Sequence, residues 1–109
     1  MMNQPNIDPR TDRFVVQVDP EIKEIVPIFL QNRLNDIESL SKALEAGDFE
    51  TIRILGHSMK GSGGGYGFDG ITDIGQYLEQ AAKEQNSEMV RKQVECLADY
   101  LERLEVVCE

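Results

Sequence analysis

Apolar residues recur every three or four positions over most of the chain, which is the spacing of one face of an α-helix. The first long pattern follows Pro27, and Gly47 and Asp48 stand where it stops. Glycine is common just past a helix end and aspartate is a common N-cap, so a second helix is predicted to begin after Asp48. The apolar stripe of the first pattern consists of Leu30, Leu34, Ile37, Leu40 or Ser41, and Leu44.

Two further helical patterns fill the second half of the chain. The third runs from Ile71 to Ala82 and ends near Gln85 and Asn86. The last begins at Asn86 or Ser87 and continues to the end of its apolar stripe, whose members are alternately four and three positions apart. That stripe consists of Val90, Val94, Leu97, Leu101 and Leu104.

The N-terminal part has a different pattern. Asp19-Pro20-Glu21 combines an N-cap residue, a proline suited to a first turn and an acidic residue, which predicts a helix start. Pro27 interrupts the helical pattern after this start, so we expect a short helix over 20–26 and a longer one from Pro27, with one kinked helix as the alternative. Residues 14–18 are expected to be a short extended segment with no second strand to pair with. Residues 1–13 are polar and are predicted to form a flexible arm.

Four long amphipathic helices joined by short breaks are typical of a helix bundle. The predicted fold class is therefore all-α: an antiparallel up-down-up-down four-helix bundle with a short extra N-terminal helix. A chain of 109 residues suffices for one hydrophobic core but not for two. Residues 14–109 are therefore expected to form a single domain.

Charge and composition narrow the classes of function. A formal net charge of −9, with eleven scattered Lys and Arg residues, argues against nucleic-acid binding, which needs clustered basic residues. No apolar signal segment and no apolar stretch of about 18 residues is present, so neither secretion nor membrane insertion is expected. Cys96 and Cys108 are twelve residues apart in one predicted helix, about 18 Å along its axis and too far for a disulfide. A cytoplasmic monomer with reduced thiols is the expectation.

A glycine-rich segment stands in the second helical pattern, where residues 48–67 have the sequence DFETIRILGHSMKGSGGGYG. A helix here gives up roughly 5 kcal/mol of helix propensity. A flexible loop, a phosphate-binding loop and a helix that presents a bare surface are the alternatives. The spacing excludes the nucleotide-binding motifs, because Ser62 stands where GxxxxGK[ST] needs lysine, and GxGxxG fails at Tyr66 and Phe68.

As a helix, the segment would have two distinct faces at about 100° per residue. The predicted core face consists of Leu55, Met59, Ser62 and Tyr66. The opposite face consists of His57, Lys60, Gly61 and Gly64, with Arg53 and Glu50 extending it toward the N-terminus. The sole histidine of the chain is therefore predicted to point away from the bundle.

This face suits a phosphoryl carrier. A neutral imidazole nitrogen of His57 is a competent nucleophile near neutral pH, and Lys60 one turn later can reach a phosphoryl oxygen. Gly61 and Gly64 remove bulk, so that another protein can approach. A surface histidine without a function fits the same spacing, so the spacing alone leaves both interpretations open. No metal site or cofactor is predicted in the chain itself, and the Mg²⁺ needed for transfer is expected from the partner.

The residues His57-Ser58-Met59-Lys60-Gly61-Ser62, followed by Gly67, resemble the HxxKGS…G signature of histidine-containing phosphotransfer (HPt) domains. The resemblance continues through Ile71, Leu78 and Glu79 and covers nearly the whole chain, roughly from Pro20 to Val107. It implies a four-helix bundle without intrinsic kinase activity that accepts a phosphoryl group from a receiver-domain aspartate and passes it to another. It further implies that His57 is the phosphoacceptor, Lys60 the phosphoryl-contacting cation and Gly61 the small neighbour that permits docking.

The chain departs from the common family pattern at two positions. Gly63 stands where the family often has serine, and Phe68 where it often has alanine. The Gly67-Phe68 pair is more similar to the phosphotransfer domain of chemotaxis-type histidine kinases. In those proteins a glutamate of the following helix orients the histidine, and Glu79 occupies the matching place, with an ordinary solvated residue as the alternative.

The sequence therefore predicts a phosphorelay carrier that bears a phosphoryl group on His57. Its expected partners are response-regulator receiver domains, with a histidine kinase as a further candidate. Glu50, Arg53, Gly61 and Gly64 are the predicted partner-binding residues. Two other functions stay open: the substrate domain of a chemotaxis-type kinase, and a module that binds receivers without chemistry.

Overall fold

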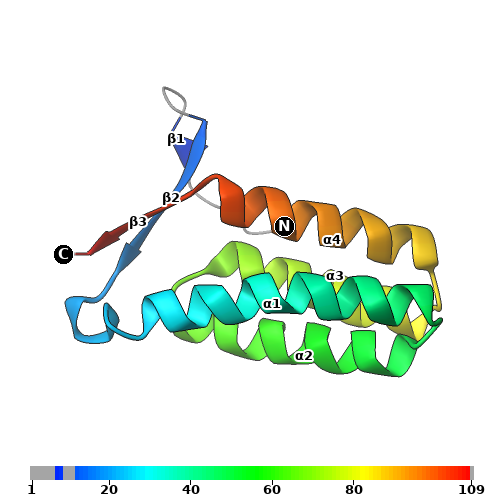
Figure 1. Ribbon diagram of the computed structural model, residues 1–109. Helices are drawn as coiled ribbons and strands as arrows, with labels where there is room; N and C mark the ends of the chain where they lie inside the picture. The colour runs from blue at the N-terminus through cyan, green and yellow to red at the C-terminus, as the bar shows by residue number, and fades with distance from the viewer. Residues whose placement is uncertain (1–6, 9–11, 109) are drawn as a thin grey trace.

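Four α-helices and a small sheet make up the computed structural model, which describes residues 7–8 and 12–108 (Figure 1). The helices are α1 (Val26–Glu45), α2 (Phe49–Gly65), α3 (Asp69–Lys83) and α4 (Ser87–Glu102). The strands are β1 (Ile7–Asp8), β2 (Arg13–Val18) and β3 (Leu104–Cys108). The loops after α1 and α3 lie at one end of the bundle and the loop after α2 lies at the other (Figure 1). The mostly helical structure agrees with the predicted all-α class, to which the sheet is an addition.

The helix boundaries follow the capping residues of the sequence. Gly47 has φ +68°, a left-handed conformation that glycine adopts without strain, and it ends α1. Asp48 then caps α2, because its side chain accepts a hydrogen bond from the backbone N–H of Thr51 at 3.1 Å. Asn86 caps α4 in the same way, accepting from the N–H of Met89 at 3.1 Å. The predicted starts of α2 and α4 are confirmed.

The predicted short N-terminal helix over 20–26 is wrong. Only Pro20–Ile22 forms a single 3₁₀ turn, capped by Asp19, whose carboxylate accepts from the N–H of Glu21 at 2.9 Å. The chain cannot continue from there as one helix, because Pro27 has no N–H to donate one turn back and its ring would clash with that carbonyl. Instead α1 begins at Val26 with Pro27 in its first turn, as predicted for the longer helix.

The expectation that residues 14–18 lack a pairing strand is also wrong. The sheet has the order β1-β2-β3, in which β2 pairs antiparallel with β1 and parallel with β3. In the parallel pair Val16 lies opposite Val106. The two strands come from opposite ends of the chain, so no local sequence pattern shows that they meet. Val16 and Val18 are buried, and the sheet therefore covers one end of the helical core.

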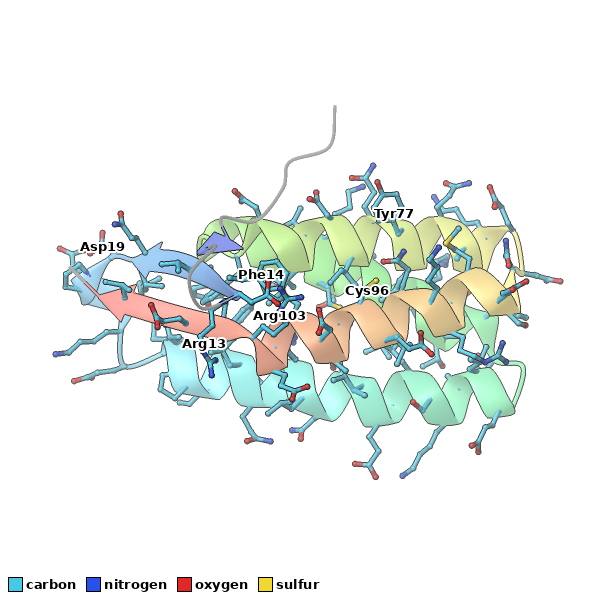
Figure 2. All side chains as sticks on the ribbon, turned by 90° about the horizontal axis from the view of Figure 1, so that it is seen from above. Arg13, Phe14, Asp19, Tyr77, Cys96 and Arg103 are labelled. Atoms are coloured by element: carbon cyan, nitrogen blue, oxygen red, sulfur yellow. The ribbon has the colours of Figure 1, made fainter. Side chains whose placement is uncertain are left out.

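The last helix ends earlier than its apolar stripe suggests. It stops at Glu102, and Leu104, predicted to be helical, begins β3. Arg103 stabilises the junction between α4 and β3. Its guanidinium donates a hydrogen bond to the carbonyl of Asp12 at 2.8 Å and lies 4.7 Å from the centre of the Phe14 ring. Phe14 and Arg103 lie side by side in Figure 2. The two cysteines consequently lie on different elements, α4 and β3, and not on one helix as predicted.

Most of the predicted flexible arm, residues 1–13, lies outside the described residues. Ile7–Asp8 forms β1 and Arg13 begins β2, and the arm and domain boundary otherwise stay a prediction.

The core lies between the four helices and under the sheet. Its largest fully buried side chains are Phe68, Leu40, Ile52, Met59, Ile71, Leu78, Leu97 and Val90. Two predicted stripes are partly wrong. Leu34 of α1 is 48% exposed, and Leu55, Ser62 and Tyr66 of α2 are only half-buried. Met59 of the predicted face is buried, and Leu55 and Tyr66 pack against the core as partly buried side chains. The other buried residues of α2 are Ile52, Gly56 and Gly63.

Helices α2 and α3 pack backbone against backbone. A Cβ atom added to Gly56 would lie 2.7 Å from the backbone N of Glu79 and 2.8 Å from the carbonyl O of Gly75. A Cβ added to Gly75 would lie 2.5 Å from the backbone N of Lys60, and one at Gly63 would lie 2.7 Å from that of Thr72. Three glycines of the two helices are therefore required by packing.

Candidate functional site

His57 stands in the middle of α2 on its solvent side. The helix forms there despite its glycines because Asp48 caps its start and its buried face packs on α3. The side chain of His57 is 69% exposed. The sequence prediction that His57 points away from the core agrees with this position.

Glu79 of α3 holds one nitrogen of the His57 ring. The distance from His57 Nδ1 to Glu79 Oε2 is 3.0 Å, and the Glu79 side chain is only 12% exposed. A carboxylate can only accept hydrogen bonds, so Nδ1 carries the proton in this contact. In a neutral ring the lone pair is then on Nε2.

Burial would raise the pKa of the Glu79 carboxyl, but the hydrogen bond from His57 and the charge of Lys60 outweigh it, with smaller contributions from the charges of Lys83 and His57. The net effect holds the pKa of Glu79 below its ordinary value. Glu79 is therefore a carboxylate at neutral pH, as its role as acceptor requires.

Lys60 approaches the same carboxylate from α2. Its Nζ lies 3.5 Å from Glu79 Oε1, while its side chain stays 45% exposed. One buried carboxylate thus contacts both the ring and the ammonium group, one through each oxygen. The structure brings the three predicted residues His57, Lys60 and Glu79 into one cluster.

The cluster depends on the close packing of α2 against α3. Gly56 directly precedes His57, and Gly75 precedes Glu79 by one helical turn. Because the backbones meet at these two glycines, the short glutamate side chain spans the distance to the ring. The sequence analysis assigned Gly61 and Gly64 to a bare docking surface and gave Gly56 no role in packing. Gly75, an interior helical glycine, was the available signal.

The four predicted partner-binding residues lie on α2, and none of their side chains forms a hydrogen bond or ion pair with the His57 ring. Glu50 and Arg53 form an ion pair with each other near the start of the helix. A Cβ at Gly61 would meet nothing within 4 Å, and one at Gly64 would meet only Thr72 Oγ1 at 3.5 Å. Neither of these two glycines is needed for internal packing.

The sequence reasoning missed one exposed apolar residue beside the histidine. Ile54 is 53% exposed and lies three residues, or about one turn, before His57. The available signal was its spacing of three residues from His57, which puts both on the same side of a helix. Ile54 and the open backbone at Gly61 flank the His57 side chain on the surface of the helix.

In the part of the chain that the structure describes, no group of three or more His, Cys, Asp or Glu side chains could hold a metal ion. No helix among residues 12–108 is long and apolar enough to span a membrane.

Comparison with known proteins identifies the family. The model of the Hpt domain family matches residues 24–106, which is most of the chain and contains the whole His57 cluster. No curated protein and no solved structure matches the chain. The chain belongs to the Hpt domain family, the phosphocarrier modules of two-component signalling. Members of this family interact with receiver domains and kinases in phosphorelays.

Proposed function

We propose that this protein accepts a phosphoryl group on Nε2 of His57 from a receiver-domain aspartate and passes it to a second receiver. The observation that carries the proposal is the contact between Glu79 and Nδ1, which leaves the other ring nitrogen of an exposed histidine free to attack. The HxxKGS sequence and the family match support the same assignment.

In the proposed step the Nε2 lone pair attacks the phosphorus of the aspartyl phosphate, and the bond from phosphorus to the aspartate oxygen breaks. The carboxylate leaves with that electron pair, and the ring gains positive charge while it keeps its Nδ1 proton. Glu79 stabilises this charge through its existing hydrogen bond. Lys60 contacts the transferred phosphoryl oxygens by leaving its 3.5 Å contact with Glu79. The reverse sequence delivers the group to the next receiver.

The exposed residues of α2 would form the docking surface. Gly61 and Gly64 let the partner approach the helix backbone, and Ile54 offers an apolar contact beside His57. Glu50 and Arg53, near the start of α2, would contribute charged contacts at the edge of this docking surface.

The remaining parts of the proposal concern the protein as a whole. The four helices are proposed to follow the antiparallel up-down-up-down course, which the alternating loop positions support (Figure 1). We propose a cytoplasmic carrier that has no kinase activity of its own and holds no cofactor. The Mg²⁺ for transfer would be bound by the receiver domain.

Incubation with a phosphorylated receiver domain is the direct test. We expect acid-labile, base-stable phosphate on the protein and none on the His57→Gln variant. The control variant Gln76→Ala changes an exposed residue of α3 and should be labelled like the parent. Labelling of His57→Gln would overturn the assignment of His57.

A second candidate is the substrate domain of a chemotaxis-type kinase. The hydrogen bond between Glu79 and His57 favours it, because a glutamate in this place is the feature that resembles those proteins. It predicts labelling by an isolated kinase catalytic domain and ATP with no receiver present. A receiver-binding module without chemistry would instead bind equally well after His57→Gln and never carry phosphate.

A further inference from the structure

A polar hollow of about 450 Å³ lies near His57, where α2 begins and α3 ends. Its walls include Asp48, Glu50 and Arg53 from α2 and its cap, and Lys83 from the last turn of α3. The family match and the sequence signature assign nothing to this hollow.

The hollow lies one helical turn from the phosphotransfer cluster. Arg53 precedes His57 by four residues and Lys83 follows Glu79 by four, which is about 6 Å along each helix. An ordinary protein interface buries about 800 Å² on each partner, an area roughly 30 Å across. A receiver domain placed over His57 would therefore cover the hollow as well.

The walls of the hollow are less acidic than the chain as a whole, because two carboxylates, Asp48 and Glu50, are balanced there by two cations, Arg53 and Lys83. The formal net charge is −9, yet Arg53, Lys60 and Lys83 all lie close enough to Glu79 to interact with it electrostatically. The nearby carboxylates are already engaged: Asp48 accepts from Thr51, Glu50 pairs with Arg53, and Glu79 contacts His57 and Lys60.

Of Arg53, Lys60 and Lys83, only Lys83 has no ion-pair partner within the described residues, so its ammonium group can pair with a group of a docked protein. Backbone N–H groups at the start of α2 add partial positive charge to the same wall. We propose that this hollow receives an acidic side chain of the docked receiver domain, and that Lys83, with Arg53, determines which receivers are good partners. The inference rests on the proposed phosphotransfer function and extends it to partner selection.

Charge reversal at Lys83 tests this proposal with a matched control. Lys83→Glu and Lys92→Glu make the same change in net charge, but Lys92 lies on α4, across the bundle from α2 (Figure 1). We expect Lys83→Glu to lower the second-order rate of transfer from the fastest receiver about tenfold at low salt, with a smaller effect at high salt. Lys92→Glu should have little effect. Glu50→Gln, which releases Arg53 from its ion pair, should raise the rate.

The outcomes distinguish failure of the hollow's role from failure of the phosphotransfer function. Normal labelling of the parent protein with equal rates for Lys83→Glu and Lys92→Glu would overturn the role of the hollow and leave the phosphotransfer function standing. No labelling of the parent by any receiver would overturn both. A change in the ranking of receivers caused by Lys83→Glu alone would support selection at this site.

Discussion

In the proposed function, Glu79 is the residue that most strongly determines the chemistry of His57. Its carboxylate is largely buried between α2 and α3 and contacts the ring through one oxygen and Lys60 through the other. An exposed imidazole without such a contact would interconvert between tautomers and rotate about its side-chain bonds. Groups that orient a reactive histidine are typically worth about 10- to 100-fold in its function, as measured for histidine ligands of metals.

We therefore predict that Glu79→Gln slows phosphorylation of His57 by roughly 10- to 100-fold without preventing it. A glutamine can turn its NH₂ group toward the ring and so favour the wrong tautomer. The rate of labelling and the ¹⁵N shifts of the His57 ring measure the two effects. Glu84→Gln, at an exposed position directly after α3, is the control. Unchanged rate and unchanged ring tautomer in Glu79→Gln would contradict the positioning role.

The pH dependence of stability gives an independent measurement of the same group. The pKa of Glu79 is held below its ordinary value of 4.5, so its ionised form stabilises the fold at higher pH. That contribution is lost as the pH falls through the lowered pKa. The difference in unfolding free energy between the parent and Glu79→Gln should thus be full at pH 7 and shrink below about pH 4.5. Urea unfolding across this range tests it, and a difference that grows in acid would contradict it.

At the scale of the element, α2 contains glycines of two kinds. Gly56 and Gly63 lie where any side chain would overlap the backbone of α3, so packing requires them. Gly61 and Gly65 have open space around their missing side chains, so packing does not explain them. Gly56 and Gly63 lower the helix propensity of α2 but allow α3 to pack close to it. Gly61 and Gly65 lower it as well and leave the outer surface of α2 without side chains.

Alanine at the two kinds of position should therefore have opposite effects on stability. Gly56→Ala should lower the free energy of unfolding by about 1–3 kcal/mol or more, because α2 and α3 must separate. Gly61→Ala should raise it by about 1 kcal/mol, since the helix interior gains propensity at no steric cost. Urea unfolding measures both. We also expect Gly61→Ala to slow transfer from a receiver although it stabilises the protein, and a stabilised variant with normal transfer would argue against docking over Gly61.

At the scale of the whole molecule, the sheet joins the two ends of the described chain. Strand β2 lies between β1 and β3, and Arg103 connects the end of α4 to the start of β2. The guanidinium of Arg103 also forms ion pairs with the carboxylates of Asp12 at 2.8 Å and Asp99 at 3.0 Å. This junction involves β2, β3 and α4, whereas the proposed phosphotransfer cluster involves α2 and α3, so the stability that the junction provides can be changed without altering the cluster.

Removal of the Arg103 side chain should separate these two properties. We expect Arg103→Ala to lower the free energy of unfolding by about 1–2 kcal/mol through lost hydrogen bonds and the lost contact with Phe14. Labelling of His57 should be unchanged under conditions where the variant is folded. Arg91→Ala, an exposed position on α4, is the control for stability. A loss of labelling in folded Arg103→Ala would show that the two ends of the molecule are coupled.

Local signals in the sequence predicted much of this protein. Asp48, Asn86 and Gly47 set the limits of helices because capping and left-handed conformations are properties of single residues and their neighbours. Helical spacing likewise predicted that His57 is exposed, and the HxxKGS residues predicted the family.

Contacts between distant segments were decided only by the tertiary structure. The pairing of β2 with β3 joins residues about 90 positions apart, and the spacing of apolar residues within a segment does not indicate which distant segment it will pair with. The direction of Glu79 toward His57 depends on how closely α2 and α3 approach, which is set jointly by Gly56 and Gly75 on two helices. The sequence by itself determined the helices and the exposed histidine. The packing of α2 on α3 decided which ring nitrogen is held and which is free.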